Sequence, residues 1–162
     1  MIKKVVVQID DFDVNKETAF LVDISKEVGG INTFLGTVRD VNEGDTVTGL
    51  RLEHYPGMTE KALEGIDAEA QARWRLESTL IIHRFGRLAP GDQIVLVAAA
   101  SEHRETAFEA CHFLIDWLKT EAPFWKLENT PAGEQWVDAR DSDGAAAARW
   151  GHARHKSPGA AK

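Results

Sequence analysis

The alternation of apolar and polar positions divides the chain into short strands and amphipathic helices. Runs rich in β-branched residues predict strands, and the continuous apolar run over 93–100 is typical of a buried strand. Apolar residues that recur every three or four positions predict helices. The predicted strands are 3–9, 31–39, 47–55, 77–88, 93–100, 125–129 and 135–137, and the predicted helices are 14–28, 58–74 and 102–120.

Turn and capping residues separate these elements. Asp11 and Asp13 can cap the first helix, and Gly29 and Gly30 are expected to end it. Ser101 is expected to cap the third helix. We also expect a mobile, polar loop over 40–46.

The order of the elements predicts the fold class. Strands and helices do not alternate regularly, as they would in a doubly wound parallel sheet, so we expect an α+β fold with a mixed or antiparallel sheet. No internal repeat is visible. After Arg140 the composition shifts to Ala, Gly, Arg and His. This shift predicts one domain over 1–140 and a loosely ordered tail over 141–162.

The composition fits one soluble domain without a metal or cofactor. The chain has 162 residues, of which 43% are hydrophobic, and a formal net charge of -7. That charge argues against a general nucleic-acid-binding protein, and no apolar stretch approaches the roughly 20 residues of a membrane helix. Cys111 is the only cysteine, so no intrachain disulfide can form, and His54, His83 and His112 lack metal-ligand spacing. We therefore expect a cytoplasmic protein that binds neither nucleic acid nor membrane.

The predicted helix over 102–120 has one apolar stripe. Its spacing is that of a helix that faces the core. Cys111, in the middle of the stripe, is expected to be a small buried hydrophobe. The stripe consists of Ala107, Phe108, Cys111, Leu114, Ile115 and Leu118.

His103 and Arg104 occupy the first turn of this helix. Free N–H groups and the positive end of the helix dipole already favour an anion there, so cations at that end are unfavourable unless an anion binds. The pair therefore indicates a phosphate or carboxylate site. A solvated surface pair is the alternative that the two residues alone leave open.

Two lysines are further candidates for an anion site. Lys119 lies on the border of the apolar stripe, where its ammonium would be half-buried and could act as a nucleophile or proton donor. A snorkelling lysine at a helix end is the alternative. Lys126 and Glu128 would share one face of a short strand if Trp125 and Leu127 face the core. A solvated strand face is the alternative there.

Four segments, taken together, resemble the molybdopterin synthase large-subunit family. The first is Phe-Leu-Gly-Thr-Val-Arg-Asp at 34–40, and the second is Leu-Glu-His-Tyr-Pro-Gly-Met-Thr at 52–59. The third is His-Arg-Phe-Gly-Arg-Leu-Ala-Pro-Gly-Asp at 83–92. The fourth runs from Ser-Glu-His-Arg at 101–104 to Lys-Leu-Glu at 126–128. The combined pattern covers most of the domain and is far more specific than any one segment.

This resemblance implies a fold, an activity and partners. The fold would be an α/β hammerhead with an additional small β-sheet. The activity would be that of a sulfurtransferase without a cofactor, which moves two sulfurs from the thiocarboxylated Gly-Gly tail of a small ubiquitin-like carrier to cyclic pyranopterin monophosphate. The product would be the molybdopterin dithiolene of molybdenum cofactor biosynthesis, and the assembly a homodimer within a heterotetramer. The implied substrate-binding residues are Thr37, Val38, Arg39, His103, Arg104, Lys119, Lys126, Leu127 and Glu128, and the implied catalytic residues are Lys119 and Lys126.

The chemistry of sulfur transfer suggests roles for the residues near the end of the helix. Protons must move at the pterin side chain, and the carrier must leave as a carboxylate. Lys119 is the candidate acid or base, and it could also hold the carrier tail by its charge or by a transient covalent link. Lys126 would support negative charge, and Glu128 would orient a lysine.

Two of the phosphate-binding candidates, His103 and Arg104, lie far along the helix from Lys119. Arg39, His103 and Arg104 are the residue types that bind a phosphate. Sixteen residues separate His103 from Lys119, which on one straight helix places them roughly 24 Å apart. We therefore predict a pocket at a homodimer interface, with Lys119 and Lys126 from one subunit and the His-Arg pair from the other.

The sequence alone leaves two other functions open. The first is a non-enzymatic module that binds a ubiquitin-like partner and an anion without turnover. The second is a different lysine-dependent enzyme that acts on a small phosphorylated compound. Borohydride would trap a Schiff base in the second case, with no need for a carrier protein.

Overall fold

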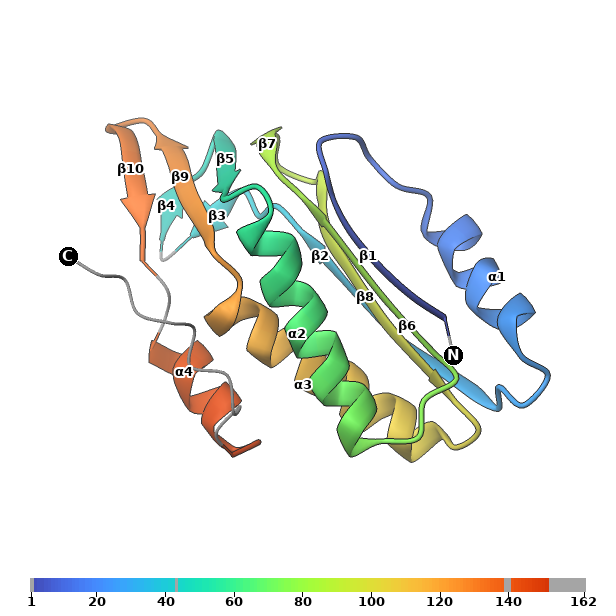
Figure 1. The fold of residues 1–162 in the computed structure, drawn as a ribbon. Helices are drawn as coiled ribbons and strands as arrows, with labels where there is room; N and C mark the ends of the chain where they lie inside the picture. Colours follow the sequence, from blue (N-terminus) through green and yellow to red (C-terminus); the bar gives the residue numbers. More distant parts are fainter. Residues whose placement is uncertain (1, 43, 139–140, 152–162) are drawn as a thin grey trace.

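The structure, a computed structural model, describes residues 2–42, 44–138 and 141–151. These residues form two four-stranded sheets, a two-stranded hairpin and four helices (Figure 1). The strands are β1 (Ile2–Gln8), β2 (Gly30–Thr37), β3 (Val41–Asn42), β4 (Asp45–Thr46), β5 (Gly49–His54), β6 (Ser78–Arg84), β7 (Gly86–Leu88), β8 (Gln93–Ser101), β9 (Phe124–Thr130) and β10 (Gly133–Val137). The helices are α1 (Val14–Ile24), α2 (Met58–Arg73), α3 (Arg104–Glu121) and α4 (Asp141–Ala148).

The first sheet has the strand order β1-β6-β8-β2. It is mixed, because β1 runs parallel to β6 while the other pairs are antiparallel. Helices α2 and α3 cover one face and α1 covers the other (Figure 1). Successive side chains of β6 and β8 point to opposite faces of the sheet, and apolar residues are packed on both faces. Ile81 and Val97 pack in the core below α2 and α3, while Leu80 and Leu96 pack with Leu21 of α1.

The second sheet, β10-β9-β5-β7, is antiparallel throughout and lies beside the first (Figure 1). Val38, Leu50, Leu52 and Leu88 form a separate core cluster on one of its faces. The prediction of an α+β fold with a mixed sheet and an additional small β-sheet is therefore confirmed. None of the helices in the described ranges combines the length and the apolar character that a membrane crossing requires.

The strand predicted over 77–88 is in fact two strands that belong to different sheets. β6 ends at Arg84 and β7 begins at Gly86. Gly86 has a φ of 88°, a left-handed conformation that glycine adopts easily. The chain can therefore leave the first sheet and enter the second within two residues, although the apolar pattern continues through the bend.

Gly29 and Gly30 do not end the first helix as predicted, because α1 already ends at Ile24. The Gly29 N–H donates to the Ser101 carbonyl at 3.0 Å. A Cβ atom on Gly29 would lie 2.1 Å from the Glu102 carbonyl oxygen. Gly29 therefore allows the chain that enters β2 to pass directly against the backbone at the start of α3.

Phe108, which the stripe predicts to face the core, is exposed, and so is Trp125, which would face the core under one interpretation of its strand. The side chain of Phe108 is 59% exposed and that of Trp125 is 48% exposed. Phe108 lies at the border of the α3 stripe beside β2, which is the last strand of its sheet, so no further strand covers it. Trp125 lies on the face of β9 opposite to Leu50 and Leu52. The other members of the stripe are buried, as predicted.

The tail that was predicted to be loosely ordered begins with a helix. Ala147 of α4 is 3% exposed and packs in the same core cluster as α3. Trp150 donates from Nε1 to Asp116 Oδ2 at 2.8 Å, and its ring meets Phe113 edge-on. The expectation of a loose tail therefore does not hold for 141–151, whereas 152–162 lie outside the described residues. The domain boundary at residue 140 stays a prediction.

His83, near the end of β6, connects the two sheets. Its ring stacks on Phe124 at the start of β9, with the ring centroids 3.7 Å apart. Its Nδ1–H donates to the Arg84 carbonyl at 2.8 Å. Burial lowers the pKa of His83 to about 4; the nearby charge of His54 adds to this effect, and the hydrogen bond to Arg84 opposes it. The ring is therefore neutral at pH 7 and supports the strand that carries Lys126.

We expect His83 to make the protein less stable as the pH falls below 6.5. The unfolded chain takes up a proton near pH 6.5, whereas the folded chain protonates His83 only near pH 4, so stability present above pH 6.5 is lost between these values. The loss should be about 3 kcal/mol. Urea unfolding at pH 7 and pH 4 should show a smaller loss in His83→Phe. His103→Gln, which changes a 75% exposed side chain, should behave like the wild type. Equal losses in the wild type and His83→Phe would contradict this expectation.

Candidate functional site

Four side chains from two segments of the chain form one hydrogen-bonded network at the second sheet. Lys126 Nζ lies 2.9 Å from Glu128 Oε1. Asn42 Nδ2 donates to both carboxylate oxygens of Glu128, at 2.9 and 3.1 Å. Arg39 Nη2 donates to Asn42 Oδ1 at 3.3 Å. One carboxylate and one amide therefore hold two cations near each other.

Strand β9 directs Lys126 and Glu128 to the same face. The two residues are opposite Leu52 and Leu50 of β5, and side chains two residues apart on a strand point the same way. Their ion pair confirms the prediction that they share a face. Leu127 points to the other face and is 5% exposed, so its side chain takes no part in the network.

Val38 anchors the segment that presents Arg39. Its side chain is buried in the core cluster of the second sheet. Its N–H donates to the Asp92 carbonyl at 2.9 Å, and its own carbonyl accepts from the Gly91 N–H at 2.8 Å. Thr37 and Arg39, on either side, are exposed. The implied substrate-binding triplet therefore consists of two exposed residues around a buried anchor.

Glu128 is a buried carboxylate, 3% exposed. Burial alone would raise its pKa, but hydrogen bonds from Lys126 and Asn42, together with the charges of Lys126 and Arg39, lower the pKa below its ordinary value. Glu128 is therefore ionised at neutral pH and neutralises one of the two cations. Because protein donors occupy its oxygens, it is suited to orient Lys126 rather than to contact a ligand.

Lys119 lies in the last turn of α3. Only Ala122 and Pro123 separate α3 from β9, so the chain turns directly from Lys119 toward the strand that carries Lys126. The expected half-buried position is wrong for the protomer, because the side chain is exposed. None of the acidic side chains in the described ranges forms an ion pair with Lys119. Its ammonium is available to an anion.

Thr59 fixes the connection between α3 and β9. This residue is fully buried at the start of α2. Its Oγ1 accepts from the Tyr55 N–H at 3.0 Å and donates to the Pro123 carbonyl at 3.3 Å. The contact joins the end of β5 to the segment between Lys119 and Lys126, and it therefore restricts how these two lysines move relative to each other.

His103 and Arg104 lie at the opposite end of α3. His103 is the N-cap residue, but its side chain makes no capping hydrogen bond. Ser101, the predicted cap, is instead the last residue of β8. Because α3 is one continuous helix, its rise of about 1.5 Å per residue places His103 roughly 24 Å from Lys119. The protomer therefore does not bring the His-Arg pair to the two lysines.

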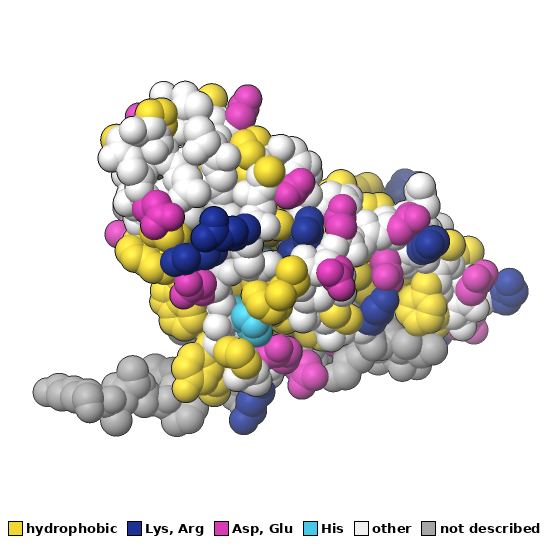
Figure 2. Space-filling model, turned by 90° about the horizontal axis from the view of Figure 1, so that it is seen from above, with side chains coloured by type: hydrophobic (Ala, Val, Ile, Leu, Met, Phe, Trp, Pro, Cys, Tyr) yellow, Lys and Arg dark blue, Asp and Glu magenta, His cyan; other side chains and the backbone are white. Residues whose placement is uncertain are grey.

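Lys119 and Arg39 are each suited to bind an anion. Glu128 already pairs with Lys126, and within the described residues neither Lys119 nor Arg39 forms an ion pair with a carboxylate. Figure 2 shows one face of the molecule, on which lysine and arginine side chains lie beside acidic and hydrophobic ones. An arginine can bind a phosphate through two parallel hydrogen bonds, and an ammonium stabilises negative charge that develops in a reaction.

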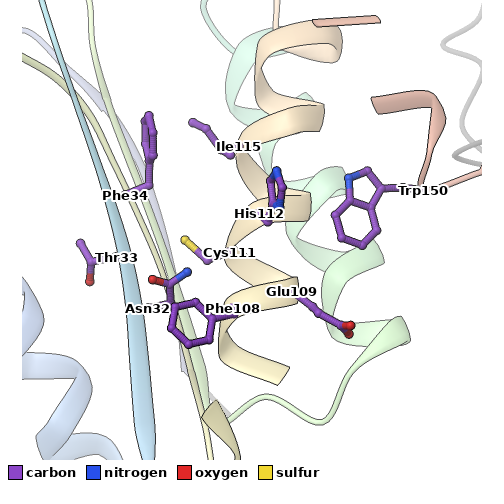
Figure 3. Close-up of a pocket in the computed structure, with 9 residues that line it drawn as sticks. All are labelled: Asn32, Thr33, Phe34, Phe108, Glu109, Cys111, His112, Ile115 and Trp150. Carbon is purple, nitrogen blue, oxygen red and sulfur yellow. The ribbon is translucent and has the colours of Figure 1, made fainter. Parts of the chain in front are cut away.

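A separate apolar pocket of about 340 Å³ lies between β2 and α3 (Figure 3). Cys111 points into it from α3, with Phe34 on the strand side and Phe108 on the helix side. Burial raises the pKa of the Cys111 thiol to about 12, so this cysteine is unreactive, as expected for a core residue. The pocket lacks the cations of the network. In the described ranges no group of three or more His, Cys, Asp or Glu residues is placed to hold a metal ion.

Asn42 is the residue of the network that sequence reasoning missed. The segment 40–46, expected to be a mobile loop, contains the hairpin of β3 and β4, in which Asn42 pairs with Asp45. A polar segment directly after Arg39 was the available signal. The partner, Glu128, is 86 residues away in the sequence, so no local pattern could reveal the contact.

Known proteins resemble this chain over most of its length. A family model described as MoaE protein matches residues 7–121. The chain is 56% identical to the molybdopterin synthase catalytic subunit of Ralstonia nicotianae over 145 residues, which cover 90% of this chain and 82% of that protein. It is 53% identical to the protein of the same name from Escherichia coli over 147 residues, which cover 91% and 97%.

Solved structures resemble the fold as well. A molybdopterin biosynthesis MoaE protein from Burkholderia ambifaria matches with a TM-score of 0.81 and 54% identity, covering 94% of this chain and 100% of that one. Molybdopterin synthase from Staphylococcus aureus matches with a TM-score of 0.76 and 31% identity, covering 85% and 99%. The likeness therefore concerns the whole fold rather than one motif.

Proposed function

This chain belongs to the MoaE protein family, and from that premise we propose that it acts as the catalytic, sulfur-transferring subunit of molybdopterin synthase. It takes sulfur from the thiocarboxylated C-terminus of a small carrier subunit. The acceptor is cyclic pyranopterin monophosphate, which receives two sulfurs and becomes the molybdopterin dithiolene. The relatives that bear this name support the activity.

The cations at the end of α3 and beside β9 are the main structural support for this function. Lys126 is held in place by Glu128, while Lys119 and Arg39 offer their charges to a ligand. The substrate carries a cyclic phosphate, and the reaction leaves a carboxylate on the carrier. Both anions need cationic partners, and these side chains supply them.

Each transfer moves sulfur from the acyl carbon of the carrier to a carbon of the pterin side chain. The thiocarboxylate sulfur forms a bond to the pterin carbon, whose bond to oxygen breaks. Water then attacks the acyl carbon, the bond from that carbon to sulfur breaks, and the carrier leaves as a carboxylate. We assign the proton movement at the pterin to Lys119. Lys126 stabilises the negative charge on substrate or leaving group, and Glu128 orients Lys126.

We assign His103 and Arg104 of a second copy to the same site. Within one protomer these residues lie at the far end of α3 from Lys119. A twofold-symmetric homodimer would place the start of one α3 near the end of the other and create two equal sites. The unsatisfied N–H groups of the first helical turn would then help the His-Arg pair to bind the phosphate.

An apolar surface on the first sheet supports this homodimer. β2 is an edge strand, and Phe34 and Leu35 on it are 37% and 42% exposed. Phe108 of α3, 59% exposed, lines the same apolar pocket as Phe34 (Figure 3). Exposed apolar side chains that gather at an unpaired strand edge are typical of a surface that another chain covers.

The proposal includes a cytoplasmic location and a catalytic domain over 1–140. Cys111 is a free, buried cysteine, which is compatible with a reducing compartment. The strands and helices that carry the network end with β10 at Val137.

Turnover of the purified chain with a thiocarboxylated carrier and cyclic pyranopterin monophosphate tests the proposed function. We expect a dithiolene product and two carriers consumed for each pterin. Binding of the carrier and of an anion without product would favour the non-enzymatic module. A Schiff base trapped by borohydride in the absence of a carrier would favour a different lysine-dependent enzyme.

A further inference from the structure

Asn42 lies in the middle of the cation network, although the family resemblance does not imply it as a site residue. Its amide nitrogen donates to both oxygens of Glu128, at 2.9 and 3.1 Å. Its amide oxygen accepts from Arg39 Nη2 at 3.3 Å. One neutral side chain therefore separates the guanidinium of Arg39 from the buried carboxylate that already holds Lys126.

We propose that Asn42 is a positioning residue, which keeps Arg39 apart from the Glu128 carboxylate so that the charge of Arg39 remains available to the substrate. This inference rests on the proposed function, because it assigns Arg39 to the cyclic phosphate. Asn42 itself touches neither substrate nor carrier. It acts through Arg39 on one side and through the Glu128–Lys126 pair on the other.

The burial of Glu128 explains why a spacer is needed. A carboxylate that is 3% exposed must receive hydrogen bonds from the protein or attract a nearby cation. Lys126 reaches Oε1, and Asn42 donates to both oxygens. Without the amide, Glu128 would attract the guanidinium of Arg39 in its place. Arg39 would then be neutralised in an ion pair and displaced from the substrate.

The hairpin of β3 and β4 places this amide. Asn42 pairs with Asp45, and Val41 pairs with Thr46, so the backbone around Asn42 is held by a strand partner. Arg39 precedes Asn42 by only three residues. The same short segment therefore carries both the cation and the group that separates it from Glu128.

Steady-state turnover of the complex with thiocarboxylated carrier and cyclic pyranopterin monophosphate tests the inference. Asn42→Ala should lower kcat/KM roughly tenfold to a hundredfold, since a hydrogen bond to a buried charge is lost. Thr46→Ala changes an exposed side chain of the same hairpin and should stay within about twofold of the wild type. In a Glu128→Gln background, which has no carboxylate to attract Arg39, Asn42→Ala should lower kcat/KM at most about threefold. The inference would be overturned if Asn42→Ala lowered kcat/KM less than about twofold in the wild-type protein. It would also be overturned if Asn42→Ala lowered kcat/KM as much in the Glu128→Gln background as in the wild type.

A crystal structure of Asn42→Ala provides a readout that does not depend on turnover. We expect the guanidinium of Arg39 to move toward Glu128 by about 1 Å or more, a displacement large enough to impair a binding site. Arg39 and Lys126 in unchanged positions would refute the spacer role. If the wild-type complex forms no product, the proposed function fails, while this structure still decides the role of Asn42.

Discussion

Replacing Lys119 with alanine should abolish sulfur transfer and leave the fold intact. The rate should fall roughly 10²- to 10⁴-fold, because that is the usual contribution of a general acid or base. Lys119 is exposed and forms no ion pair with the described residues, so the free energy of unfolding should change by no more than about 0.5 kcal/mol. The initial rate of dithiolene formation and urea unfolding measure the two effects.

Two further variants separate the chemistry of Lys119 from its charge. Lys61→Ala removes an exposed lysine from α2 and should leave turnover near the wild-type rate. Lys119→Arg keeps a positive charge but does not readily exchange a proton, so its turnover should stay low. Near-normal turnover in Lys119→Ala would exclude Lys119 as the acid or base. Normal turnover in Lys119→Arg would reduce its role to charge alone.

Gly29→Ala should destabilise the protein and weaken turnover at the same time. The new Cβ atom would lie 2.1 Å from the Glu102 carbonyl oxygen, so the backbone at the start of α3 must shift. Overpacking of this kind costs about 1–3 kcal/mol of unfolding free energy. His103 and Arg104 would shift with the backbone, and we expect a roughly tenfold lower turnover, because a small misplacement of binding groups is costly.

The neighbouring glycine is the matched control for Gly29→Ala. A Cβ atom on Gly30 would meet Arg104 Cα at 3.4 Å, an ordinary contact. Gly30→Ala should therefore change the unfolding free energy by no more than about 0.5 kcal/mol and leave turnover unchanged. If urea unfolding shows the same small change for both variants, the close approach at Gly29 does not matter for stability.

Helix α3 illustrates what the sequence could predict about the fold. Its apolar positions recur with the helical period, and Cys111 and Leu114 are buried as that period predicts. Phe108 belongs to the same stripe but is 59% exposed, because the sheet ends at β2. Where a sheet ends depends on strand order, which is set by contacts between distant segments. Periodicity describes one element at a time and cannot supply this information.

The candidate site, like the fold, could be predicted from the sequence only in part. The two-residue period of a strand was enough to predict that Lys126 and Glu128 share a face, and their ion pair agrees. Asn42 could not be found, because its contact with Glu128 spans 86 residues. The exposure of Lys119 could not be foreseen either, since a helical wheel does not show whether another element covers the end of the helix.

Mixed dimers test most directly whether Lys119 of one subunit works with His103 and Arg104 of the other. One variant carries His103→Ala and Arg104→Ala, and the second carries Lys119→Ala; each should be inactive alone. Subunits that exchange freely form mixed dimers in which one of the two sites is intact, so the mixture should recover about a quarter of wild-type turnover. Different affinity tags on the two variants confirm that mixed dimers have formed. If the mixed dimers remain as inactive as the separate variants, the site is not shared between subunits.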